Sequence, residues 1–255
     1  MAKAKALILR APGTNCNVEA AFAFEQAGAE ATHVHVNQLL RREERLSDYQ
    51  IMVIPGGFTY GDDIASGKVL ANELRLRLGE DIQRFIDKSG LMLGICNGFQ
   101  IMVRGGILPP FANGVQQVTL TNNDSGRFEC RWVHLKVNQK SPCIFTKGIG
   151  SMYLPVAHGE GKLVAETSIL PKLNAVVAYA DEKGDTRAGY PHNPNGSVDN
   201  IAGICDDSGR IFALMPHPER HIRTTQHPQW TRQPSKDHGD GFKIFQNAVE
   251  WVEAI

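Results

Sequence analysis

The stretch LMLGICNGFQ, residues 91–100, decides the fold that we predict. Leu91–Ile95 is a short apolar run, which indicates a buried strand, and a helix can begin at Asn97. Between them Cys96 occupies the G-x-nucleophile-x-G pattern of a sharp strand-to-helix turn, with cysteine in place of serine. Glycines suit such a turn because larger side chains would collide with neighbouring elements. The helix N-terminus favours a thiolate, although a buried structural cysteine gives the same pattern.

Short apolar runs alternate with amphipathic segments through the first hundred residues. We expect strands at Lys5–Leu9, Thr32–Val36, Ile51–Ile54 and Leu91–Ile95. We expect helices after a cap at Asn15 or Asn17 and over Val69–Lys88, and a short charged helix or turn over Leu39–Leu46. This alternation predicts an α/β fold with a mostly parallel, flavodoxin-like sheet flanked by helices. Active sites of such sheets lie at the carboxyl ends of the strands, where Gly57 and Cys96 fall.

The second half of the sequence has a different pattern. Strands without long intervening helices are predicted at Val115–Thr121, Phe128–Val137 and Met152–Val156, followed by a hairpin of Ile201–Cys205 with Ile211–Met215. This pattern predicts an antiparallel extension of the sheet. Residues 221–240 are polar and irregular, and Phe242–Val252 is an amphipathic helix. Without a repeat or a linker, residues 1–255 are expected to form a single domain.

Composition narrows the class of protein. The 27 basic and 27 acidic side chains balance, and no basic run appears, which argues against a nucleic-acid partner. No apolar run is long enough for a signal peptide or a membrane span, so we expect no membrane association. The five cysteines are scattered, with no C-x-x-C pair, as is typical of reduced thiols. We therefore expect a cytoplasmic globular protein.

A reactive thiol at Cys96 would need a base and an orienting acid. The strongest candidates are His217, just past a predicted strand, and Glu219, two residues further on. In an extended segment these side chains face the same way, so Glu219 can fix the imidazole tautomer as the acid of a triad does. The alternative is a surface histidine beside a surface glutamate.

The backbone offers two donors for an oxyanion. One is the N–H of Asn97, which follows the nucleophile, and the other is that of Gly57, in the Pro-Gly-Gly turn after a strand. An ordinary turn at Gly57 is the alternative interpretation.

Two further patterns do not predict sites. Gly61–Lys68 resembles a phosphate-binding loop, but five residues separate its glycines where the pattern has four, and Val69 stands where serine or threonine is required. His217, His221 and His227 suggest a metal site, yet the intervening prolines prevent a helical H-x-x-x-H face. We therefore expect no metal.

Five segments together resemble the class I glutamine amidotransferases, the triad type with a Cys nucleophile. They are IPGGFTYGD (54–62), GICNGFQ (94–100), PVAHGEG (155–161), NGS (195–197) and MPHPER (215–220), in family order across nearly the whole chain. The GFTYGD and AHGEG stretches are most similar to the glutaminase subunits of phosphoribosylformylglycinamidine synthases. The resemblance implies the class I glutamine amidotransferase fold.

The resemblance also implies roles. Cys96 would attack the side-chain amide of L-glutamine, giving a thioester and ammonia, with His217 as base and then acid, oriented by Glu219. Gln100 and the Gly57 turn would hold the substrate. The ammonia would pass to a synthetase subunit, accompanied in some complexes by a small third subunit, that uses ATP and Mg to make formylglycinamidine ribonucleotide in purine biosynthesis. No cofactor is implied for this chain itself. The long segment 221–240 departs from the compact family form and leaves the arrangement of partners open.

Two alternative functions, from other classes of protein, remain. A cysteine hydrolase or chaperone on the same turn would not need the pair His217 and Glu219. A non-catalytic regulatory subunit would be expected to lack Cys96 or His217, and both are present.

Overall fold

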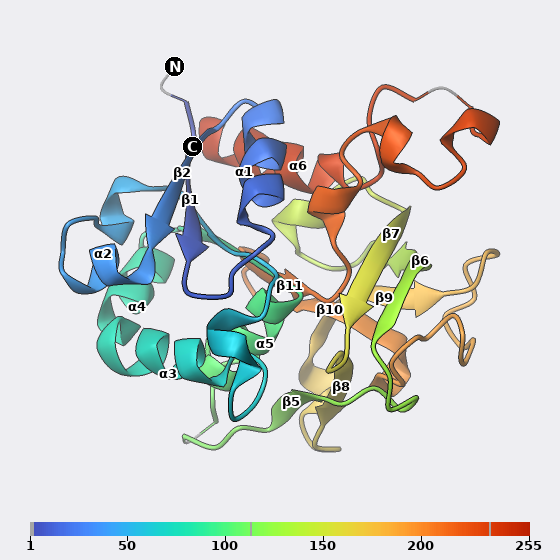
Figure 1. The fold of residues 1–255 in the computed structure, drawn as a ribbon, viewed down its shortest axis with the longest axis horizontal. Coiled ribbons are helices and arrows are strands. Elements are labelled where there is room, and N and C mark those ends of the chain that lie inside the picture. The colour runs from blue at the N-terminus through green and yellow to red at the C-terminus, as the bar shows by residue number, and fades with distance from the viewer. Residues whose placement is uncertain (1–2, 113, 235) are drawn as a thin grey trace.

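A large mixed sheet organises the computed structural model, which describes residues 3–112, 114–234 and 236–255. Its strand order is β2-β1-β3-β4-β11-β10-β9-β6-β7, as Figure 1 shows. The strands of this sheet are β1 (Lys5–Arg10), β2 (Glu30–His35), β3 (Ile51–Ile54), β4 (Leu91–Ile95), β6 (Glu129–Val137), β7 (Ser151–His158), β9 (Asn174–Ala180), β10 (Ile201–Cys205) and β11 (Ile211–Leu214). A separate antiparallel pair is formed by β5 (Val118–Thr121) and β8 (Lys162–Ala165).

The five strands from β2 to β11 are parallel, and the four that follow are antiparallel. The predicted fold class, a parallel α/β sheet with an antiparallel extension, is confirmed. The placement of β11 matters most for the site, because it pairs in parallel with β4 and its Leu214 lies opposite Ile95. The residues that follow β11 therefore leave the sheet beside Cys96, although more than a hundred residues separate them in sequence.

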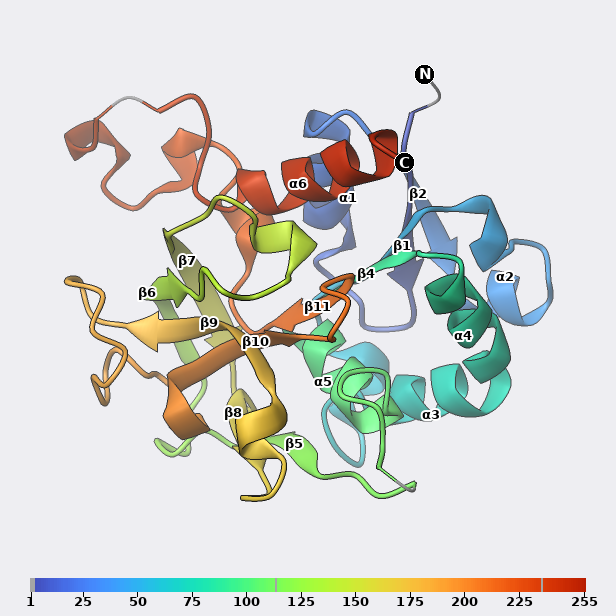
Figure 2. The ribbon, with the colours of Figure 1, turned by 180° about the vertical axis from the view of Figure 1, so that it is seen from behind.

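Six helices cover the sheet in the described part of the chain. They are α1 (Asn17–Gln26), α2 (Val36–Leu40), α3 (Lys68–Arg77), α4 (Gly79–Asp87), α5 (Asn97–Gly105) and α6 (Phe242–Glu253). Figures 1 and 2 show α1 and α6 together on one side of the parallel strands and α3 and α5 on the other. The rings of Phe24 and Phe245 join α1 to α6 edge to face, with centroids 5.0 Å apart. No helix of the described residues is long and apolar enough to cross a bilayer.

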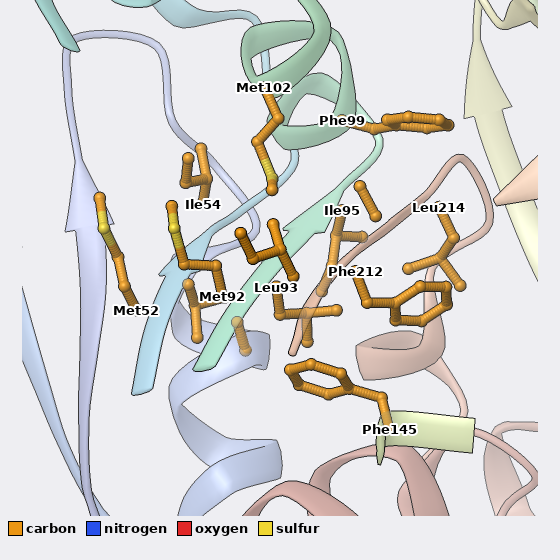
Figure 3. Close-up of a cluster of buried hydrophobic side chains, with 14 of the residues drawn as sticks. Met52, Ile54, Met92, Leu93, Ile95, Phe99, Met102, Phe145, Phe212 and Leu214 are labelled. Carbon is orange, nitrogen blue, oxygen red and sulfur yellow. The ribbon is translucent and has the colours of Figure 1, made fainter. Parts of the chain in front are cut away.

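The core surrounds β3 and β4, whose residues are all buried, as expected for parallel strands covered on both faces. Figure 3 shows Met102 of α5 lying over Ile54 and Met92, while Phe145 lies on the opposite side of the strands near Phe212. Burying side chains of this size stabilises the fold by about 1.5–3 kcal/mol each. The strand that carries Cys96 is therefore held on both faces.

Several predicted elements differ from the structure. The expected helix over Val69–Lys88 is two helices, because Leu78 leaves helical dihedral angles (φ −119°, ψ 4°) before Gly79 starts α4. The helix or turn expected over Leu39–Leu46 is helical only at Leu39 and Leu40, the end of α2, and continues as turns. The helix α2 begins earlier, at Val36, because His35 and Gln38 form a capping box that also ends β2 at His35. Neither Asn15 nor Asn17 caps α1, whose N-cap is Cys16 with no side-chain cap bond.

The second half contains strands that the sequence analysis does not predict. β9 lies between β10 and β6, and β8 pairs with β5 outside the main sheet. The strand predicted over Val115–Thr121 begins only at Val118 and belongs to this small pair. The hairpin of β10 and β11 and the helix α6 are confirmed. The described residues of 221–240, which leave out residue 235, are irregular as predicted, with short 3-10 turns at Thr224–Gln226 and Trp230–Arg232.

Candidate active site

Cys96 stands at the junction of β4 and α5 in a strained conformation (φ 53°, ψ −107°) that a non-glycine residue rarely adopts. The flanking glycines are required by close packing. A Cβ on Gly98 would lie 1.8 Å from the carbonyl oxygen of Ile54, and one on Gly94 would lie 2.4 Å from Met102 Sδ. The turn predicted from the sequence is present, and its sulfur lies at the start of a nine-residue helix.

The arm that carries His217 leaves the sheet at the end of β11. The backbone N–H of His217 donates to the carbonyl of Pro155 on β7 at 2.8 Å, which ties the arm to a second strand. His217 Nδ1 lies 2.6 Å from Glu219 Oε1, and both residues are at most 2% exposed. We predicted an extended segment here, but Glu219 lies in a 3-10 turn, Pro218–Arg220. The turn still brings the carboxylate onto Nδ1.

The surroundings of His217 favour its charged form. Burial alone lowers the pKa of an imidazole, but the Glu219 carboxylate and the Cys96 sulfur raise it, and the net pKa lies well above 6.5. His217 Nε2 is buried and has no hydrogen-bond partner among the described residues. With Nδ1 on Glu219, this nitrogen is the one left for chemistry. The Cys96 sulfur lies 3.7 Å from the Ala157 carbonyl oxygen at the end of β7.

The Gly57 turn faces the N-terminal segment. Gly57 forms an isolated antiparallel bridge with Thr14, and a Cβ on it would lie 2.7 Å from the Gly13 carbonyl oxygen. Its φ of 153° is open to glycine and unfavourable for other residues. In the described part of the chain, neither Gly57 N–H nor Asn97 N–H donates to a protein acceptor. Both predicted oxyanion donors are therefore available, and their role stays a prediction.

The Asn97 side chain joins this turn to α5. Its Oδ1 accepts the Thr59 hydroxyl at 2.8 Å and the Thr59 N–H at 3.2 Å. Its Nδ2 donates to Asp62 at 3.1 Å and to Gln100 Oε1 at 2.8 Å. Gln100 in turn donates through Nε2 to the Glu160 carbonyl at 2.5 Å. Both ends of the Gln100 amide are thus engaged by protein, and its role in holding the substrate stays a prediction.

Asn97→Ala is expected to destabilise the chain and to weaken glutamine binding. The change leaves the buried hydroxyl and backbone N–H of Thr59, and the buried Oε1 of Gln100, without the partner that Asn97 supplies. Each unsatisfied buried group costs about 1–3 kcal/mol. We expect the free energy of unfolding to fall by about 2–4 kcal/mol and KM for glutamine to rise, measured by denaturant titration and steady-state kinetics. Gln83→Ala, which removes an exposed amide bonded to Asp87, is the matched control. Equal stability of the two variants would contradict this role.

Cys16 is a neighbour of the site that the sequence analysis does not identify. Its sulfur lies 4.0 Å from His217 Nδ1, accepts a hydrogen bond from Arg220 Nη2 at 3.1 Å and donates to Asn15 Oδ1 at 3.1 Å. The Cys16 backbone N–H donates to the Gly56 carbonyl. Cys16 thus connects the Gly57 turn with the His217 arm. Its separation of 201 residues from His217 left no local signal in the sequence.

Cys16, His217 and Glu219 carry potential metal-ligand atoms within 4.8 Å of one another. The guanidinium of Arg220 beside the same sulfur disfavours a cation there, and we interpret the group as a hydrogen-bonded cluster. The other histidines considered for a metal, His221 and His227, pack instead against Trp132. The absence of a bound metal stays a prediction.

The turn, the thiol and the histidine–carboxylate pair have the arrangement expected of a triad-type amidotransferase site on an α/β sheet. In agreement, the sequence profile of the CobB/CobQ-like glutamine amidotransferase domain matches residues 3–252. The chain belongs to this family of glutamine amidotransferases.

Within this family, the chain is similar to a particular group of relatives. The chain is 57% identical, over the full length of both sequences, to phosphoribosylformylglycinamidine synthase subunit PurQ of Dehalococcoides mccartyi. It is 43% identical to the subunit of the same name from Methanococcus maripaludis, with 97% of each chain covered. Among solved structures, a chain of PurLQS from Thermotoga maritima superposes with a TM-score of 0.76 at 31% identity, covering 98% of this chain and 100% of that chain.

Proposed function

We propose that this chain hydrolyses L-glutamine to glutamate and ammonia and supplies the ammonia to a synthetase that makes formylglycinamidine ribonucleotide. One observation carries the chemistry: the buried His217–Glu219 pair beside the thiol of Cys96 on its strained turn. The substrate and the pathway rest on the full-length similarity to PurQ subunits. We further propose that residues 1–255 act as one domain, which the unbroken match over residues 3–252 supports.

The proposed reaction uses groups already described. The Cys96 thiolate attacks the carboxamide carbon of glutamine, and the developing oxyanion is stabilised by the N–H groups of Asn97 and Gly57. The C–N bond then breaks as His217 Nε2 gives a proton to the leaving nitrogen, which departs as NH₃. Water attacks the thioester with the same imidazole as base, releasing glutamate and the free thiol. Glu219 holds the tautomer and stabilises the imidazolium throughout.

The acceptor chemistry is assigned to partner chains. The relatives are named as subunits, and the solved structure is the assembly PurLQS. We therefore propose that the ammonia passes to a synthetase subunit that binds ATP and Mg, and that the complex works in the cytoplasm, as the scattered free cysteines favour. Coupling to a partner also suits the chemistry, because an uncoupled site would waste glutamine.

A covalent label tests the nucleophile. A diazoketone or chloroketone analogue of glutamine is expected to add once per chain, at Cys96, because the strained strand-to-helix turn presents this thiol at a helix N-terminus. Intact mass followed by peptide mapping measures the site. Cys96→Ser is the control for label specificity, and Cys130, the exposed cysteine, reports background reactivity. Label spread over Cys130 and the other cysteines would refute the assignment and favour a non-catalytic subunit.

A further inference from the structure

A second buried histidine lies beside the proposed triad and has no role in it. His158 is the last residue of β7 and is 3% exposed. The preceding residue, Ala157, carries the carbonyl oxygen that lies 3.7 Å from the Cys96 sulfur. The ring packs closely on the backbone of Gly161, where a Cβ would lie 2.2 Å from His158 Cε1. The position of the imidazole is therefore fixed.

The tautomer of this imidazole follows from Asn123. The Asn123 side chain donates through Nδ2 to two carbonyl oxygens, those of Arg127 at 2.9 Å and His158 at 2.8 Å. Its Oδ1 must then be the acceptor, and it receives the Gly161 N–H at 3.0 Å. The remaining contact of Oδ1 is His158 Nδ1 at 3.1 Å, which must donate. His158 therefore carries its proton on Nδ1, and Nε2 is a bare lone pair.

This lone pair has no donor among the described residues. His158 Nε2 is buried and unpartnered, a costly state for a polar atom. Burial, and then the charge of His217, lower the pKa of His158 to about 3, so the ring stays neutral beside a protonated His217. This acceptor belongs to the residue that directly follows the Ala157 carbonyl at the Cys96 sulfur, so the small N–H donor formed at Cys96 is the candidate partner nearest to it in the proposed reaction.

We propose that His158 Nε2 accepts a hydrogen bond from the ammonia released at Cys96 and so holds it as NH₃ for transfer. The inference rests on the proposed function. In the step concerned, the C–N bond of glutamine breaks, His217 gives its proton to the leaving nitrogen, and the neutral molecule donates one N–H to His158. No bond to His158 forms. Because Nε2 of the neutral imidazole carries no proton, it cannot protonate the ammonia, which stays uncharged as a nucleophile for the synthetase must be.

The experiment measures coupling in the reconstituted complex with the synthetase. Glutamate and the amidine product are quantified in the same reaction, and synthesis from ammonium chloride normalises for the synthetase. His158→Phe keeps a ring of similar size but removes the lone pair. Losing one hydrogen bond changes a binding equilibrium about 2- to 10-fold. We therefore expect the ratio of ammonia lost to solvent over ammonia transferred to rise by about this factor. His33→Phe, on the exposed edge strand β2, is the matched control.

Each other outcome overturns the proposal. If His158→Phe leaves the ratio of lost to transferred ammonia unchanged but greatly lowers glutamate formation, His158 is the base of the reaction. If that ratio is unchanged but KM for glutamine rises, the lone pair binds the amino group of the substrate. Gly161→Ala displaces the ring without removing it and should uncouple similarly if His158→Phe does not fold. Imidazole ¹⁵N spectra of the unmodified chain provide a separate test, because a proton on His158 Nε2 would refute the inference. If the proposed function itself fails, the unmodified complex will not consume glutamine at all.

Discussion

Cys96→Ser is expected to abolish glutamine-dependent synthesis in the reconstituted complex, while synthesis from added ammonium salts continues at the unmodified rate. The serine hydroxyl has a far higher pKa than a thiol, and the site around it is built for a thiolate at a helix N-terminus beside a charged imidazole. We expect a loss on the order of 10³-fold or more in glutamine turnover. The measurement is amidine formation with glutamine or with ammonium chloride as the nitrogen source.

The two nitrogen sources separate the two half-reactions. Loss of both activities would mean that the serine variant has damaged the complex, and retention of both would remove Cys96 from the chemistry. Cys130→Ser changes an exposed thiol and should leave both activities intact. The same assay on the isolated chain tests coupling, because we expect poor glutamine turnover without the synthetase. Equal turnover alone and in complex would refute partner dependence and leave the triad standing.

The parallel half of the fold was predictable because its signals are local. Runs such as Ile51–Ile54 and Leu91–Ile95 are continuous and apolar, as buried parallel strands must be. The strand-to-helix turn at Cys96 was predictable for the same reason, since Gly94 and Gly98 lie only two residues before and after it. The pairing of His217 with Glu219 was also local, and it survives although the backbone forms a turn where an extended segment was expected.

The features that were not predicted depend on contacts between distant residues. Cys16 is held at the site by two such contacts. Its backbone N–H donates to the Gly56 carbonyl, and its sulfur accepts a hydrogen bond from Arg220. The lone pair of His158 follows from Asn123, an amide 35 residues away whose orientation is fixed by two carbonyl groups. β9 had a local signal, the apolar run around Val177, but its place between β10 and β6 is set by antiparallel pairing that only the folded sheet defines.

His217→Asn and Glu219→Gln are expected to lower glutamine turnover without unfolding the chain, and the histidine change should be the more severe. A positioned acid–base group contributes about 10²- to 10⁴-fold, so His217→Asn should cost a factor in this range. Glu219→Gln keeps a hydrogen-bond acceptor near Nδ1 but removes the negative charge. It should therefore cost less in turnover and change its pH dependence, as measured in the complex by steady-state kinetics across pH.

The direction of the pH change follows from the surroundings of His217. Burial lowers the pKa of His217, and the Glu219 charge is the largest of the opposing effects that raise it. Without that charge the pKa of His217 falls, so the limb of the pH–rate profile that reports its deprotonation should move to lower pH. Glu250→Gln, on the surface of α6, is a matched charge removal that should leave the profile unchanged. If His217→Asn retained full turnover, another residue would be the base, and His158 would be the next candidate, its own lone pair then abstracting the thiol proton. An unshifted profile in Glu219→Gln would instead show that the carboxylate only holds the arm in place.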